Sequence, residues 1–202
     1  MAVVEVEDPK VRDERTAASD APAAALPRPL QGDRWTWEDL ERIPRVEGLR
    51  FEVLDGQLVV NASPRRAHQR LLLSLAEQLR RRCPDALEVL PGFDVRLLDG
   101  DAAEPDLLVV DPDQGDERAV VGPPALVVEL LSPTTRLQDL GRKRQLYAAL
   151  GVPSYWVVDV DEPWLLELRL TDDGTYAEAR HDGPGPHRLT VPFAVDVDLR
   201  LP

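Results

Sequence analysis

The fold of this chain is decided by two stretches, EPDLLVVDPD (residues 104–113) and ALVVELLSPTTRLQDLGRKRQLYAALGVPSYWVVD (residues 125–159). Short continuous apolar runs such as LLVV and LVVELL are typical of buried strands. Residues 134–151 then predict a helix that ends at Gly151, because glycine favours the left-handed conformation in which helices often end. Residues 152–160 predict a further strand. This order of strand, strand, helix and strand indicates mixed α and β structure.

Three charged side chains stand out in these stretches. Asp106 lies at the start of the first apolar run, Glu129 interrupts the second, and Lys143 lies on the helix. Two acids on adjacent strands with a lysine nearby can hold a divalent metal ion and activate water. We interpret Glu129 as functional, because a charge inside an apolar run is costly to bury unless it is paired or coordinated. Asp139 lies four residues before Lys143, and that pair has a plain alternative interpretation as a surface ion pair.

The segment before these stretches predicts a β-hairpin. LRFEVL (residues 49–54) and QLVVNA (residues 57–62) flank Asp55-Gly56, which is a turn signal. Glu52 lies in the first of these strands. A strand carboxylate usually faces solvent, but one beside a metal site also serves as a ligand or as a neighbour of the ligands. Residues 111–124 predict a polar loop.

Residues 64–82 predict an amphipathic helix, because leucines recur at helical spacing along them. The polar positions carry the densest positive charge of the chain, at Arg65, Arg66, Arg70, Arg80, Arg81 and Arg82. Two interpretations stay open for these arginines: a solvated face that stabilises the helix C-terminus, or a surface that contacts nucleic-acid phosphates. His68 lies near the helix start, where a lone histidine is more often structural than catalytic.

Composition limits the class of protein. The 202 residues, 43% of them apolar, fit one domain, which we expect over residues 31–202. Residues 1–30 are rich in Ala, Pro and charge and predict a disordered tail. A single cysteine, no secretory signal and no long apolar run predict a cytoplasmic protein without a membrane partner. The net charge of −13 argues against a general nucleic-acid coat, but not against a nuclease with a local positive patch.

Several pieces of the sequence together resemble the PD-(D/E)XK restriction-endonuclease-like superfamily, and specifically its bacterial Uma-type endonucleases. In the family's order, the matching pieces are FEVLDGQLV, SPRRAHQ, Pro105-Asp106, VVELLSPTT, Lys143 with Tyr147, and GVPSYWVVD. The resemblance implies an α/β (α+β) fold with a central mixed β-sheet flanked by helices and an N-terminal β-hairpin. It also implies a site at one edge of that sheet.

The resemblance assigns roles to the charged residues. It implies that Asp106 and Glu129 bind Mg²⁺ or Mn²⁺, and that Lys143 and Glu52 join them as catalytic residues. The sequence departs from the superfamily pattern at Leu131, which stands where a lysine is expected, so Lys143 on the following helix is the candidate for that role. The candidates for contacting nucleic acid are Arg65, Arg66, Arg70 and His68.

The resulting hypothesis is a Mg²⁺-dependent endonuclease, a hydrolase of nucleic-acid phosphodiester bonds, with DNA favoured over RNA. The alternative is a non-catalytic binding or scaffold module that keeps the nuclease fold. Exposed strand edges would let either protein form a homodimer. A zinc site is poorly supported, because the three histidines are scattered along the chain and there is one cysteine.

Overall fold

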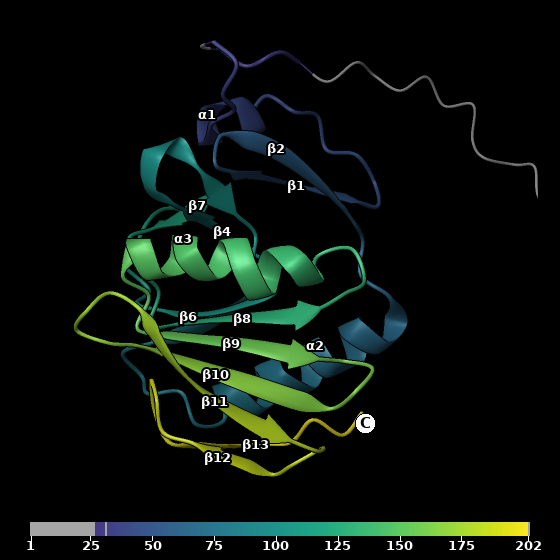
Figure 1. Ribbon diagram of the computed structural model, residues 1–202, viewed down its shortest axis with the longest axis vertical. Coiled ribbons are helices and arrows are strands. Elements are labelled where there is room, and N and C mark those ends of the chain that lie inside the picture. Colours follow the sequence, from purple (N-terminus) through teal and green to yellow (C-terminus); the bar gives the residue numbers. More distant parts are fainter. Residues whose placement is uncertain (1–26, 31, 202) are drawn as a thin grey trace, which may run out of the picture.

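The computed structural model describes residues 27–30 and 32–201. The tail predicted over residues 1–30 therefore lies largely outside the described residues. The described chain forms three β-sheets and two longer helices, α2 (Arg66–Arg80) and α3 (Lys143–Leu150). In Figure 1 the N-terminal strands lie at the top, the largest sheet in the middle and the short C-terminal strands at the bottom.

The largest sheet has six strands in the order β11-β10-β9-β8-β6-β3. β8 and β9 run parallel and the other neighbours antiparallel, so the sheet is mixed, as predicted. Every residue of β6, β8 and β9 is buried, which explains why these strands read as continuous apolar runs. The strands of this sheet are β3 (Glu88–Pro91), β6 (Leu107–Val110), β8 (Leu126–Leu131), β9 (Ser154–Asp159), β10 (Trp164–Leu170) and β11 (Tyr176–Asp182).

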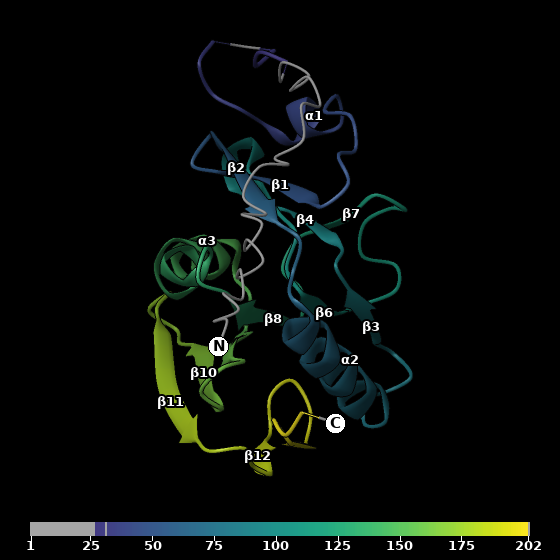
Figure 2. The ribbon, with the colours of Figure 1, turned by 90° about the vertical axis from the view of Figure 1, so that its right-hand side faces the viewer.

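The helices α2 and α3 cover opposite faces of this sheet (Figure 2). Leu75 of α2 packs in the same core as Val128 of β8. Tyr147 of α3 packs in the core on the other face, together with Val127. Val127 and Val128 are adjacent in the chain, and neighbouring strand residues point to opposite faces. The predicted central sheet flanked by helices is therefore confirmed.

A second sheet contains five strands in the order β2-β1-β5-β4-β7. The predicted N-terminal hairpin forms β1 and β2 and turns at Asp55 and Gly56, which have φ angles of 58° and 71°. The expectation of a polar loop over residues 111–124 is wrong in part, because β7 lies inside it and runs parallel to β4. A strand of three residues is too short to show a period of two. The bounds are β1 (Leu49–Leu54), β2 (Gln57–Ala62), β4 (Asp94–Arg96), β5 (Ala102–Ala103) and β7 (Ala119–Val121).

The helix predicted over residues 134–151 forms with one departure. A π-helical turn, η2 (Gln138–Arg142), precedes α3 and continues into it. The helix ends at Gly151, whose φ of 90° lies in the left-handed region. None of the described helices is long and apolar enough to cross a membrane. The remaining elements are α1 (Trp37–Leu40), η1 (Leu98–Gly100), β12 (His187–Leu189) and β13 (Val195–Val197).

Candidate active site

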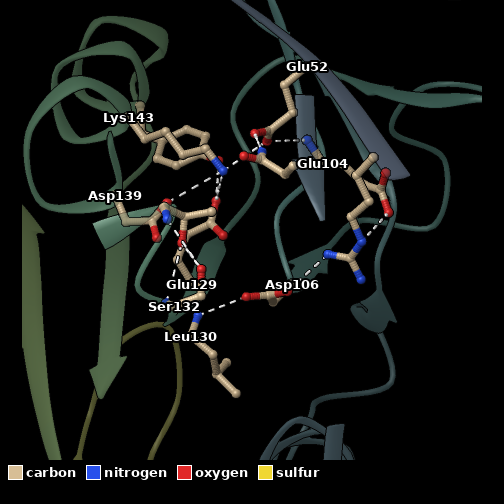
Figure 3. Close-up of polar contacts among 12 residues, drawn as sticks. Glu52, Glu104, Asp106, Glu129, Leu130, Ser132, Asp139 and Lys143 are labelled. Atoms are coloured by element: carbon tan, nitrogen blue, oxygen red, sulfur yellow. Dashed lines mark hydrogen bonds and ion pairs between the residues drawn. The ribbon is translucent and has the colours of Figure 1, made fainter. Parts of the chain in front are cut away.

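The two predicted carboxylates meet where β6 and β8 lie side by side. Leu107 pairs with Val128 in this antiparallel pair, so the register continued by one residue places Asp106 opposite Glu129. Both line a cavity of about 40 Å³, together with Glu52 and Lys143. Figure 3 shows these side chains converging from four different segments. The site does not lie on an edge strand of the sheet, because β6 and β8 each have a neighbour on both sides.

Lys143 and Tyr147 of α3 hold Glu129 on one side of this cavity. The Lys143 Nζ lies 2.8 Å from Oε1 of Glu129 and 2.8 Å from Oε1 of Glu52. Tyr147 donates its hydroxyl hydrogen to the same Glu129 oxygen at 2.9 Å. The two α3 residues lie four positions apart, on one face of the helix. The exposed fractions of Lys143, Glu129 and Glu52 are only 2%, 3% and 2%, so solvent screens these charges weakly.

The pKa values of this group reflect its burial. Burial raises the pKa of Glu129 well above its ordinary value, Lys143 opposes that shift, and Asp139 adds to it. Burial alone would lower the pKa of Lys143, but the charges of Glu129 and Glu52 outweigh burial and hold that pKa well above its ordinary value. Lys143 is therefore protonated at neutral pH and acts as a cation rather than as a base.

Asp139 is a third carboxylate beside Lys143. Its Oδ1 lies 3.6 Å from Nζ of Lys143, and its exposed fraction is 1%. Burial raises its pKa to about 6. The interpretation of Asp139 and Lys143 as a surface ion pair is therefore wrong, because both residues are buried. The spacing of four residues predicted the pair, but it does not indicate which face of the helix is buried.

Asp106 is held by donors from three other segments. Arg50 of β1 donates from a guanidinium nitrogen to Oδ1 at 3.1 Å, and the backbone N–H of Leu130 donates to Oδ2 at 2.9 Å. His68 of α2 places its Nε2 3.0 Å from the same Oδ2. Burial by itself would raise the pKa of Asp106. The hydrogen bond with His68, the charge of His68 and the hydrogen bond from the Leu130 N–H outweigh burial and bring that pKa below its ordinary value.

Glu52 reaches the cavity from the N-terminal hairpin. The side chain of Asn61 on β2 donates to Oε2 at 2.7 Å, and the backbone N–H of Glu104 donates to Oε1 at 3.0 Å. Oε1 is also the atom that contacts Lys143. Glu52 is thus buried and facing the other acids, rather than facing solvent. It connects the hairpin to α3.

Comparison with known proteins identifies the family to which the chain belongs. The sequence matches the model of the Uma2 family, described as "Putative restriction endonuclease", over residues 37–201. The chain belongs to the Uma2 family. A crystal structure described as "a putative nuclease belonging to DUF820", from Anabaena variabilis, is similar to the chain with a TM-score of 0.66 and 15% identity. The match covers 81% of this chain and 94% of that one, and it confirms the predicted fold class. None of the curated proteins compared with the chain matches it.

The predicted nucleic-acid contacts of this Uma2 chain divide into two kinds. Arg65, Arg66 and Arg70 are exposed near the start of α2. Arg65 contacts the exposed Asp161 at 3.2 Å, a pair that contributes little to stability. His68, on the same stretch of helix, is buried and contacts Asp106 instead. The arginines thus face solvent beside the cavity, whereas His68 orients a carboxylate inside it.

The donors of the Uma2 cavity fit a hard divalent cation. Asp106 and Glu129 offer carboxylate oxygens, which Mg²⁺ prefers, and Mg²⁺ usually takes one or two carboxylates and keeps several waters. Among residues 27–30 and 32–201, no group of three or more His, Cys, Asp or Glu side chains is placed to enclose a metal ion. Two carboxylates would leave further coordination positions for substrate oxygens and water, as Mg²⁺ and Mn²⁺ sites usually do.

Sequence reasoning missed Arg50 and Asn61. Arg50 precedes Glu52 by two residues and therefore shares its face of β1, which was a usable signal. Its partner Asp106, however, lies 56 positions further along the chain. Only the contact between the two sheets brings them together.

Proposed function

We propose that this protein is a metal-dependent endonuclease that hydrolyses phosphodiester bonds of DNA. One observation carries the proposal: Asp106 and Glu129, from adjacent strands, and Lys143, from the following helix, line one buried cavity. Membership of a family described as "Putative restriction endonuclease" favours DNA over RNA as the substrate. The cofactor we propose is Mg²⁺, with Mn²⁺ as a substitute.

Asp106 and Glu129 are the residues that would hold the ion. When bound, Mg²⁺ supplies Lewis-acid polarisation of the phosphate and a more acidic water molecule. Arg50, His68 and the Leu130 N–H fix the orientation of Asp106 before substrate arrives. Such prior orientation matters because catalytic groups that are already placed do not reorganise during the reaction.

Lys143 supplies fixed positive charge beside the carboxylates. Its ammonium group is protonated at neutral pH and donates to Glu129 at 2.8 Å. A buried cation in this position stabilises the negative charge that develops on the phosphate during hydrolysis. Glu52 and Asp139 hold the ammonium in place from two other directions. We therefore assign electrostatic stabilisation to Lys143 and a positioning role to Glu52.

The decisive experiment measures Mg²⁺-dependent cleavage of DNA by the full chain and its Glu129→Gln variant. Glutamine keeps the size of the side chain but removes the charge that the ion requires, so we expect cleavage to fall about 100-fold or more. Asp172→Asn is the matched control, because it neutralises an exposed carboxylate in the turn after β10. Wild-type rates in Glu129→Gln, or cleavage that persists after metal chelation, would contradict the proposal.

A second candidate function is a non-catalytic module that keeps the nuclease fold and binds a partner. The net charge of −13 favours it, because that charge opposes tight DNA binding at physiological salt. A folded protein that neither takes up Mn²⁺ in calorimetry nor cleaves DNA would support this candidate. The outer strands are β2 and β7 in the five-stranded sheet and β11 and β3 in the six-stranded sheet, and light scattering would reveal a homodimer built on one of them.

A further inference from the structure

A large groove adjoins the catalytic cavity on the side of the N-terminal sheet. It encloses about 1110 Å³ and lies between residues 37–47, β1 and β4. Arg50 and Glu104 line both this groove and the cavity that contains Asp106 and Glu129. The Arg50–Glu104 ion pair, at 3.4 Å, thus forms a wall common to the groove and to the cavity where we put the scissile phosphate. The volume of the groove is many times the 40 Å³ of the cavity itself.

A smaller pocket also adjoins the cavity. It encloses about 270 Å³ at the start of α2, and it shares His68 and Ser132 with the catalytic cavity. The groove and the pocket thus each share lining residues with the cavity that holds the carboxylates. A strand of nucleic acid alternates phosphate and nucleoside, so neighbouring parts of one strand can occupy neighbouring subsites.

The groove and the smaller pocket differ in the charges of their lining residues. The residues that line the smaller pocket include Arg65 and the hydroxyls of Ser132 and Thr134, and no carboxylate. The residues that line the groove include three arginines but five acids, Glu41, Glu47, Asp94, Glu104 and Glu117. Phosphates favour the pocket and are repelled by the groove. The groove therefore suits the uncharged part of a nucleotide, its base.

Aromatic side chains in the groove supply what a base needs. Phe51 of β1 and Phe93, directly before β4, are half-buried and line its wall. Bases stack on such rings when they are taken out of a duplex, and their hydrogen-bonding edges then face the protein. Asp94 lines the same wall, and burial raises its pKa to about 7. Near neutral pH its carboxyl group is partly protonated, so it both donates and accepts hydrogen bonds.

We propose that the groove beside Phe51 and Phe93 binds an unpaired nucleoside next to the scissile phosphate, and that the substrate is therefore unpaired DNA. A base held against these rings cannot remain paired in a duplex. This inference rests on the proposed function for the position of the scissile phosphate. It adds the class of substrate: a single strand, or a duplex region whose strands are already separated.

The test measures binding by fluorescence anisotropy, with the Glu129→Gln variant so that no cleavage occurs. The probes are a fluorescein-labelled single-stranded deoxyoligonucleotide and the matching duplex. We expect the single strand to bind at least about tenfold more tightly, and Phe93→Ala in this background to weaken that binding roughly tenfold. Phe93→Tyr retains the aromatic ring and should restore it. Leu73→Ala is the matched control, because Leu73 is 72% exposed on α2 and lines neither space.

A second measurement does not depend on how the Phe93 variants fold. A single-stranded oligonucleotide that carries 5-iodouracil is irradiated in complex with the Glu129→Gln protein, and the cross-linked peptide is identified. We expect a peptide that contains Phe51 or Phe93. Cross-links confined to α2, or equal affinity for the duplex and the single strand, would overturn the inference.

These outcomes are separate from the fate of the proposed function. If wild-type protein cleaves no DNA with Mg²⁺, the proposed function fails, and the binding preference and the cross-link still decide whether the groove takes an unpaired base. If the protein cleaves duplex DNA and Phe93→Ala binds and cleaves like wild type, the groove inference fails and the endonuclease remains.

Discussion

The two sides of the candidate active-site cavity hold their carboxylates in opposite ways. Asp106 accepts hydrogen bonds from Arg50, His68 and a backbone N–H, and its pKa lies below its ordinary value. Glu129 is buried among other acids, relies on Lys143 and Tyr147, and has a raised pKa. The two residues face each other across one strand pair. Strand position thus brings the acids together, while the surrounding donors decide how readily each acid keeps its charge.

Removal of the cation from the Glu129 side should have the largest effect. Lys143→Met leaves three buried carboxylates without their shared partner, and loss of one member of a buried ion pair costs roughly 3–5 kcal/mol of unfolding free energy. We expect cleavage to fall about 100- to 1000-fold. Urea unfolding and Mg²⁺-dependent cleavage measure the two effects. Arg144→Met is the control, because Arg144 follows Lys143 in the chain but pairs with the exposed Glu178. If Lys143→Met were as stable as Arg144→Met, the Glu129 side would not depend on its cation for stability, and this contrast with the Asp106 side would fail.

The Asp106 side should tolerate the loss of one donor better. His68→Gln leaves Arg50 and the Leu130 N–H in place, so Asp106 remains charged. A group that orients a metal ligand typically contributes about 10- to 100-fold to metal affinity. We expect the Mg²⁺ concentration for half-maximal cleavage to rise by that factor, with most of the maximal rate recovered at saturating Mg²⁺. An unchanged Mg²⁺ titration, with Gln69→Ala as the reference variant, would remove His68 from the site.

The hydroxyl of Tyr147 gives a finer comparison within the Glu129 side. Tyr147→Phe removes a hydrogen bond to a carboxylate, for which we expect a loss of about 1.5–3 kcal/mol of unfolding free energy. Tyr155→Phe removes a bond of similar length to the backbone carbonyl of Asp139, a neutral acceptor, and should cost about 1 kcal/mol. Chemical denaturation of both variants tests the order. Equal losses would mean that Glu129 does not carry charge in the folded protein.

Asp94 is a further carboxylate with a raised pKa. Arg45, rather than Lys143, is the cation that opposes this shift. Burial, with Glu104 and Glu52, raises its pKa from 3.8 to about 7. Between these values the folded protein binds this proton more tightly than the unfolded chain does, so the contribution of Asp94 to stability falls as pH rises through that window. Asp94→Asn should remove this slope and stabilise the protein at pH 8 by up to roughly 4 kcal/mol, because each unit of pKa shift corresponds to about 1.4 kcal/mol. Thermal unfolding from pH 4 to pH 8 measures it, and parallel curves for both proteins would contradict the assignment.

Local sequence patterns were sufficient to predict most of the elements around this site and most of its acids. Apolar runs gave the buried strands β6, β8 and β9, the leucine spacing gave α2, and Gly151 gave the end of α3. Glu129 was identified from its surroundings alone, because a carboxylate within six buried strand residues needs a partner. These inferences succeed because they rest on local periodicity and on the cost of burying charge.

The partners of the acids, in contrast, could not be predicted from the sequence, because they depend on tertiary contacts. Lys143 meets both Glu52 and Glu129, and Asp106 meets Arg50 and His68, through contacts that join the hairpin, α2, α3 and the central sheet. The short strand β7 and the groove beside Phe93 also depend on segments that are distant in the chain. Local pattern carries no information about such contacts, because they form only when two sheets and two helices close around one cavity. The charged groups could therefore be identified from the sequence, whereas their protonation and their access to substrate depend on the fold.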